Sequence, residues 1–241
     1  MRRAIAWVLG VLASFATSFA FAQAVATSVT GNVTAQMGTG PSRVVIQGDT
    51  VRSGETVSTA AASAVVLRYP DGQVTSLTQN SRFHIQAYEY NPQTKSGNIL
   101  LDLLAGGVRT VSGLIAANNP SRFALKAGST TIGIRGTDFI AGFDPRQGTV
   151  VAVISGSVIV TWNGKELATL TAGQAIFVRL DGTFIVGTID SIYGQLPPGL
   201  LVAALAPFVN AQGQGPYGGA GGTPGPNVPG GSGGGGAASV K

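Results

Sequence analysis

The sequence predicts an all-β protein, either an elongated twisted β-solenoid or a sandwich-like stack of short strands. Short runs rich in Val, Ile, Thr and Phe recur at intervals of about ten residues, and glycine turns separate them. The chain has 36 glycines and 12 prolines, and only 10% of its residues are charged. This composition disfavours a helical bundle, and 44% hydrophobic residues supply enough apolar mass for a core.

Residues 1–22 are predicted to be a signal peptide and not part of the fold. Arg2 and Arg3 precede an apolar run, and Ala20-Phe21-Ala22 has the small-x-small pattern of a cleavage site. An uncleaved membrane anchor is the alternative, because the run approaches the length of a span. Cleavage would start the mature chain at Gln23 and predicts a location in the periplasm, or secretion.

Cysteine is absent from the chain, so neither disulfides nor a lipobox thiol are expected. The net charge is +5 and falls to +3 when Arg2 and Arg3 leave with the signal peptide. The basic residues are scattered and form no run, so the sequence predicts no nucleic-acid partner.

Turn signals divide the first half of the chain into strands. Residues 64–69 are predicted to form a strand that turns at Pro70-Asp71-Gly72 and returns over 73–77. Residues 83–88 alternate with period two, which is typical of a half-buried strand. Residues 99–104 are so apolar that we expect both faces of their strand to be covered.

The second half continues the pattern. Residues 149–154 and 158–162 are predicted as two strands joined by a turn at Ser155-Gly156-Ser157. Asn163-Gly164 is a strong hairpin signal. Further strands are expected over 167–170, 174–179 and 183–189.

The composition changes after residue 196. Residues 196–209 are predicted to be a short apolar capping segment, because Pro207 interrupts a run too short to span a membrane. Residues 210–241 are rich in glycine and proline and cannot bury enough surface to offset their ordering entropy. They are therefore predicted to be a disordered tail.

Four landmarks occur in order along the chain: Gly48 to Thr59, Leu67-Arg68-Tyr69-Pro70-Asp71-Gly72, Phe123-Ala124-Leu125 and Ile134-Arg135-Gly136-Thr137-Asp138-Phe139. Together they resemble a FecR domain. The resemblance implies one all-β domain over 23–195, with a motif core at 43–143 and additional strands at 149–189. It also marks a set of structural or partner-contact residues: Gly48, Asp49, Gly54, Asp71, Gly72, Arg135, Gly136, Thr137, Asp138 and Phe139.

Founding members of the FecR family carry this domain as the sensor half of a membrane-bound sigma-factor regulator, and it receives a signal from an outer-membrane receptor. This chain is predicted to start with a signal peptide where such a regulator has its sigma-binding region and membrane helix. The resemblance therefore implies a stand-alone, non-enzymatic envelope protein that acts as a protein-binding, sensory or scaffolding module. An outer-membrane receptor or a signalling component is the expected kind of partner.

Few residues could support chemistry, and no cofactor or metal is expected. His84 is the only histidine and lies in a period-two pattern, so an ordinary half-buried residue is favoured over a ligand or base. The alternative function is a glycan- or peptidoglycan-binding protein or an acid-pair hydrolase, which would use Asp138 and Asp144 with Trp162. Arg135 and Asp138 could form a direct pair only if Gly136 bulges the strand.

Overall fold

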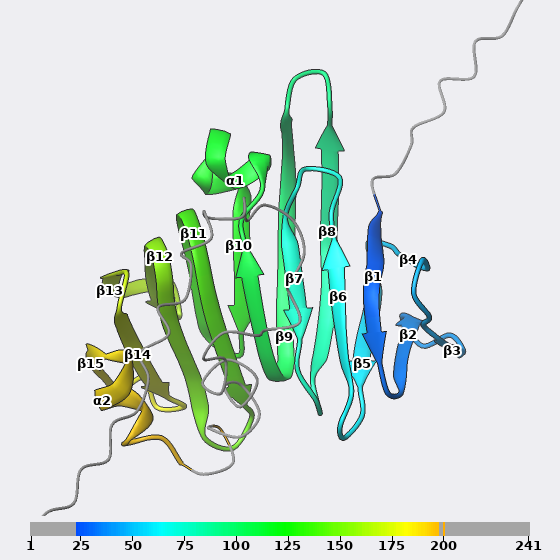
Figure 1. The fold of residues 1–241 in the computed structure, drawn as a ribbon. Coiled ribbons are helices and arrows are strands. Elements are labelled where there is room, and N and C mark those ends of the chain that lie inside the picture. The colour runs from blue at the N-terminus through cyan, green and yellow to red at the C-terminus, as the bar shows by residue number, and fades with distance from the viewer. Residues whose placement is uncertain (1–22, 198–199, 201–241) are drawn as a thin grey trace, which may run out of the picture.

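The computed structural model describes residues 23–197 and Leu200, and shows an open, all-β structure with two layers (Figure 1). The all-β prediction is confirmed. The predicted signal peptide, the tail at 210–241 and most of the capping segment lie outside the described residues. Within the described part of the chain, no helix is long and apolar enough to cross a membrane.

The first layer contains six strands that lie wholly within it: β2 (Val33–Met37), β3 (Ser42–Val44), β5 (Glu55–Thr59), β8 (Arg82–Asn91), β10 (Phe123–Ala127) and β13 (Lys165–Thr171). The second layer contains another six: β1 (Ala24–Thr30), β4 (Thr50–Val51), β6 (Ala64–Arg68), β7 (Val74–Leu77), β14 (Gln174–Arg179) and β15 (Phe184–Thr188). Three long strands belong to both layers: β9 (Ser96–Val111), β11 (Thr130–Asp144) and β12 (Gly148–Trp162).

The shared strands change partners halfway along. The first half of β9 pairs with β8 and β10, whereas its last residues pair with β7 and β11. In β11 the change falls between Arg135 and Asp138, where the register shifts. β12 pairs with β14 through its first half and with β13 through its second half. One hydrogen-bonded sheet therefore supplies both layers.

Glycine makes these bends possible. Gly106, Gly136 and Gly156 lie at the three bends and have φ angles of +87°, +58° and +78°, a region that other residues rarely adopt. A Cβ on Gly156 would also overlap the carbonyl oxygen of Gly136 on the neighbouring strand. The bends of β11 and β12 are therefore packed directly against each other.

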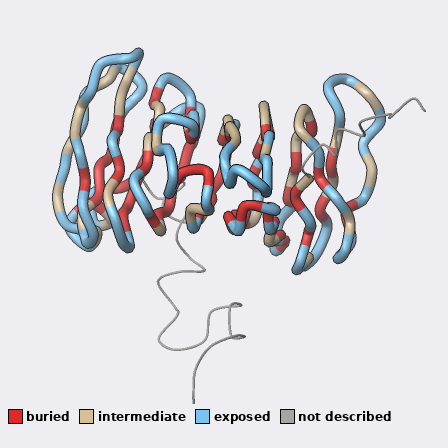
Figure 2. The backbone as a smooth tube through the Cα atoms, turned by 90° about the horizontal axis from the view of Figure 1, so that it is seen from above, coloured by how far each residue is buried: buried red, intermediate tan, exposed pale blue. Residues whose placement is uncertain are grey.

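The core lies between the layers, and buried residues follow the whole row of strands (Figure 2). Phe123 from the first layer meets Phe139 from the second edge to face, with ring centroids 6.3 Å apart. Alternation along each strand places the remaining inward side chains in the same cluster. The largest fully buried side chains come from both layers and include Leu67, Phe83, Leu101, Leu125, Phe139 and Leu170.

A second apolar cluster covers the outer face of the second layer near its C-terminal end. Ile140, Val150 and Phe177 point outward from β11, β12 and β14, and are buried there. Ile192 from the short helix α2 (Ile189–Tyr193), together with Leu196 and Leu200, covers them. Leu196 and Leu200 of the predicted capping segment thus pack on this face.

Two local predictions were wrong. Ser155-Gly156-Ser157 does not close a hairpin, because the two halves of β12 lie in different layers and form one bent strand. Residues 99–104 are not covered on both faces, since Leu104 is 39% exposed. The strands with two covered faces are instead those beneath α2.

The turns at Pro70-Asp71-Gly72 and Asn163-Gly164 are confirmed. The first joins β6 to β7, where the Gly72 N–H donates to the carbonyl of Tyr69. The second joins β12 to β13, with φ angles of +47° and +79° at its two central residues. A short helix α1 (Leu114–Asn118) and a 3₁₀ turn η1 (Pro120–Arg122) provide the crossover between the parallel strands β9 and β10.

The close packing at Gly156 predicts a large cost for Gly156→Ala. Gly164→Ala is the matched control, because Gly164 also has a positive φ but has open space around its Cβ position. We expect the control to lose about 1 kcal/mol of unfolding free energy and Gly156→Ala to lose roughly 3 kcal/mol or more. Urea unfolding of both variants measures the difference, and equal losses would show that the bends do not pack tightly.

Candidate functional site

The landmark residues Asp71, Gly72 and Arg135 to Asp138 come together along one rim of the sandwich, at the end where α1 lies (Figure 1). The residues that join them are those between the end of β9 and the start of α1, numbers 111–115. We refer to these landmark residues together with residues 111–115 as the rim. Its geometry follows from the β6–β7 turn on one side and the bend of β11 on the other.

Asp71 is 2% exposed and holds the start of α1. Its Oδ2 accepts from the Ile115 N–H at 3.3 Å, and its carbonyl accepts from the Leu114 N–H at 2.9 Å. Its Oδ1 accepts from the Gln73 N–H at 3.2 Å, which is the turn-stabilising bond expected of an aspartate here. Asp71 therefore caps a helix that lies more than forty residues further along the chain.

Two buried tyrosines support this carboxylate. The Tyr88 hydroxyl donates to Asp71 Oδ1 at 3.2 Å and accepts from the Asp71 N–H at 3.1 Å. The Tyr69 ring packs against Tyr88 with centroids 4.9 Å apart, but its hydroxyl is buried near Thr75 in a geometry that does not complete a hydrogen bond. Burial raises the pKa of both phenols and the Asp71 charge raises them further, while the nearby Thr75 hydroxyl partly offsets the rise in the pKa of Tyr69.

The bend of β11 forms hydrogen bonds with residues 111–115 from the other side. The Thr137 N–H donates to Ser112 Oγ at 3.0 Å, and the Ser112 N–H donates to the Thr137 carbonyl at 2.9 Å. Gly113 follows directly and lies so close to Asp71 that a Cβ would overlap the carboxylate. The two family landmarks are therefore linked through Ser112 and Gly113.

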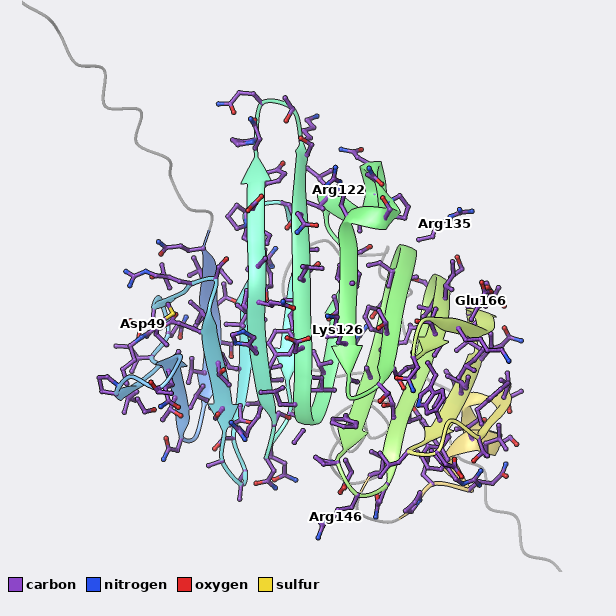
Figure 3. All side chains as sticks on the ribbon, turned by 180° about the vertical axis from the view of Figure 1, so that it is seen from behind. Asp49, Arg122, Lys126, Arg135, Arg146 and Glu166 are labelled. Atoms are coloured by element: carbon purple, nitrogen blue, oxygen red, sulfur yellow. The ribbon has the colours of Figure 1, made fainter. Side chains whose placement is uncertain are left out.

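Arg135 and Asp138 do not pair with each other. Asp138 makes a bidentate ion pair with Arg109 on β9, with N–O distances of 2.9 and 2.6 Å. Arg135 is exposed and its side chain points away from the sheet (Figure 3). Gly136 does bend the strand, and Phe139 is buried in the core. Of the charged residues in this motif, Arg135 is the one available to a partner.

Gly48, Asp49 and Gly54 lie apart from this centre, in the turns at the N-terminal end of the sheet. Gly48 and Gly54 have φ angles of +93° and +87°, and their N–H groups donate to the carbonyls of Ala26 and Ile85. Asp49 Oδ2 accepts from the Ile46 N–H at 3.0 Å and lies 3.6 Å from Arg43 Nη1. These contacts give the three residues structural roles.

Sequence reasoning missed the ion pair of Arg43 with the buried Glu55 at that end. Glu55 is 4% exposed and receives Arg43 through Nε and Nη2 at 3.1 and 3.0 Å. Its other oxygen accepts from the Arg52 N–H at 2.7 Å. A glutamate beside a glycine turn carries no signal that would reveal a partner twelve residues away.

The rim presents apolar side chains to solvent. Val111, Leu114 and Ile154 are 41%, 40% and 40% exposed. Val111 and Ser155 pair with Asp138 on its two sides, and Ile154 directly precedes Ser155. We call Val111, Leu114, Arg135 and Ile154 the rim patch.

The residues considered for chemistry do not converge. Asp138 and Asp144 lie at opposite ends of the second half of β11, roughly 20 Å apart along the strand. Asp144 accepts from the Arg146 N–H at 2.7 Å. His84 is half-buried on β8, with Nδ1 3.2 Å from Thr56 Oγ1. In the part of the chain that is described, no three His, Cys, Asp or Glu side chains gather to hold a metal ion.

Because only Tyr88 uses its hydroxyl in hydrogen bonds, removal of the hydroxyl should cost more stability at Tyr88 than at Tyr69. Tyr88→Phe removes the hydroxyl's bond to the buried Asp71 carboxylate and its bond from the Asp71 N–H, so we expect a loss of about 1–3 kcal/mol of unfolding free energy. Tyr69→Phe removes a hydroxyl without a partner and should change stability by less than about 1 kcal/mol. Denaturant unfolding at pH 7 tests both, and a larger loss for Tyr69→Phe would contradict this description of the rim.

The raised tyrosine pKa values also predict alkaline instability. Below pH 10 the phenols are neutral in both states, so their burial costs nothing further. Above about pH 10 the unfolded chain ionises while the folded protein resists, and stability falls as pH rises toward the folded pKa. Tyr69→Phe should reduce the slope by up to about 1.4 kcal/mol per pH unit between pH 10 and 11. An unchanged slope would show that Tyr69 is not shielded.

Comparisons with known proteins bear on this geometry. A family model described as FecR protein matches residues 55–159, which contain the β6–β7 turn, α1 and the bends of β11 and β12. A search of curated proteins gave no match.

Two crystal structures, at 1.65 and 2.50 Å resolution, of a "putative anti-sigma factor" from Parabacteroides distasonis ATCC 8503 are similar. Each has 15% identity and a TM-score of 0.44, and the match covers 55% of this chain and 59% of that chain. This likeness is too weak to support an argument about the present protein. The family match carries the assignment, and residues 55–159 of this chain belong to the FecR protein family.

Proposed function

We propose that this protein is an exported, periplasmic FecR-domain protein that acts as a non-enzymatic binding, sensory or scaffolding module of the cell envelope. The FecR match supports a signalling or regulatory role. The location rests on the signal-peptide pattern of residues 1–22. The expected partner is an envelope protein such as an outer-membrane receptor or a signalling component.

The rim patch is the observation that carries this proposal. Val111 and Leu114 lie in the segment that Asp71 holds from one side and Thr137 from the other. A surface built on a segment fixed at both ends loses little conformational entropy when it binds. Three exposed apolar side chains on the same rim as the exposed Arg135 also match the composition of binding hot spots, which favour desolvated apolar contacts and Arg.

The charge on the patch indicates what kind of surface it would bind. Arg135 is exposed, whereas Arg109 and Asp138 neutralise each other beside it. The patch therefore has a local positive charge next to apolar side chains. A partner with an acidic group next to an apolar anchor would complement it.

Site-specific crosslinking in intact envelopes tests the proposal. A photo-crosslinking residue at Val111 or Ile154 should capture one envelope protein, whereas the same residue at exposed Thr169 on β13 should not. Val111→Gln replaces the apolar side chain without placing a second carboxylate opposite Asp138, so it should abolish capture from Ile154 while changing the melting temperature little, because Val111 is already 41% exposed. Capture that is equal at all three positions, or that survives Val111→Gln, would refute the rim patch as the binding surface.

A further inference from the structure

The strand β15 forms one edge of the second layer. Among the described residues it pairs with β14, and its opposite edge pairs with no strand. Phe184 and Val186 are 41% and 45% exposed, and Leu180 in the preceding turn is 50% exposed. This end of the sheet lies away from α1 (Figure 1).

The backbone groups on this edge can be assigned from the ladder. The Arg179 N–H donates to the Thr183 carbonyl, and the Ile189 N–H donates to the Gly173 carbonyl. Hydrogen-bonded pairs alternate in an antiparallel ladder, so Ile185 and Gly187 also face β14. Phe184, Val186 and Thr188 therefore direct their N–H groups to the open edge, as do the carbonyls of Phe184 and Val186.

The edge lacks the protection that natural sheets use. Exposed edge strands are commonly blocked by charge, proline or bulges. The corresponding edge in the first layer, β13, carries exposed Lys165 and Glu166. The sequence of β15 is Phe-Ile-Val-Gly-Thr, without a charge or a proline, and its pairing with β14 is regular.

We propose that β15 is a self-association edge, on which a second copy of this chain adds antiparallel through its own β15. The outward groups lie at every second residue and are centred on Val186. A two-fold axis at Val186 therefore places Val186 opposite Val186 and Phe184 opposite Thr188 of the second copy. The Val186 and Thr188 N–H groups of each copy then face the Val186 and Phe184 carbonyls of the other, which is the self-complementarity that an isologous interface requires.

The side chains fit the same arrangement. Phe184 and Val186 are two residues apart, so they lie on one face of β15. Across the axis, Phe184 of each copy would reach Val186 of the other as a diagonal neighbour. Helix α2 does not occupy the edge in this arrangement, because Ile192 packs with Phe177 on the outer face of the layer. This surface is separate from the rim patch, so the proposal does not depend on the proposed function.

The test uses the full mature chain from Gln23 and measures mass by sedimentation equilibrium up to about 100 μM. We expect a monomer–dimer equilibrium that Val186→Lys weakens at least tenfold, because the substitution places two ammonium groups opposite each other. Thr169→Lys on β13 is the matched control and should leave the equilibrium unchanged. Both variants should keep the wild-type melting temperature, since both side chains are exposed.

A crosslink provides the second measurement. The chain has no cysteine, so Val186→Cys introduces a single thiol, and directly opposed residues in an antiparallel pair lie within disulfide range. Oxidation should give a covalent dimer for Val186→Cys and none for Thr169→Cys. A wild-type monomer at 100 μM, a dimer that survives Val186→Lys, or equal crosslinking of both cysteine variants would overturn the proposal.

Discussion

The structure depends on three strands that each pass from one layer of the sandwich to the other. β9, β11 and β12 bend at glycines with left-handed backbone conformations, and each bend changes the strand's partners. Because the layers share these strands, they are joined by continuous backbone as well as by the side-chain contacts of the core. A residue with a Cβ at Gly156 would push two bends apart and disturb both layers.

The bends also fix the position of the rim. Thr137 follows Gly136 directly, and its backbone holds Ser112, while Asp71 holds Leu114 and Ile115 from the opposite side. The landmarks at residues 67–72 and 134–139 therefore hold one short segment from two sides. Asp71, Thr137 and Asp138 are buried or engaged with other groups, and the exposed Val111 and Leu114 lie in the segment that these landmarks hold.

Local turn chemistry explains which parts could be predicted from sequence. Proline and glycine at residues 70–72, and Asn163-Gly164, favour one backbone geometry, and the structure has it. Ser155-Gly156-Ser157 has the same local signal, but its glycine bends a strand and does not close a hairpin. Whether such a glycine forms a turn or a bend depends on how distant strands pair. The ion pair of Arg109 with Asp138 and the capping of α1 by Asp71 join residues 29 and 44 positions apart, so no sequence window contains both partners.

The segment that matches the family does not form a complete structural unit, because its strands and its outer face pack against residues outside the match. The match begins at Glu55 and ends at Ile159, yet β6 inside it pairs with β1, which lies before it. Val150 and Ile140 inside it are shielded by Phe177, Ile192 and Leu200, which come after it. A polypeptide cut at the limits of the match would bare a strand edge at one end and an apolar surface at the other. A fusion protein that contains this module therefore has to include the whole segment from about Gln23 to Leu200 as one folding unit.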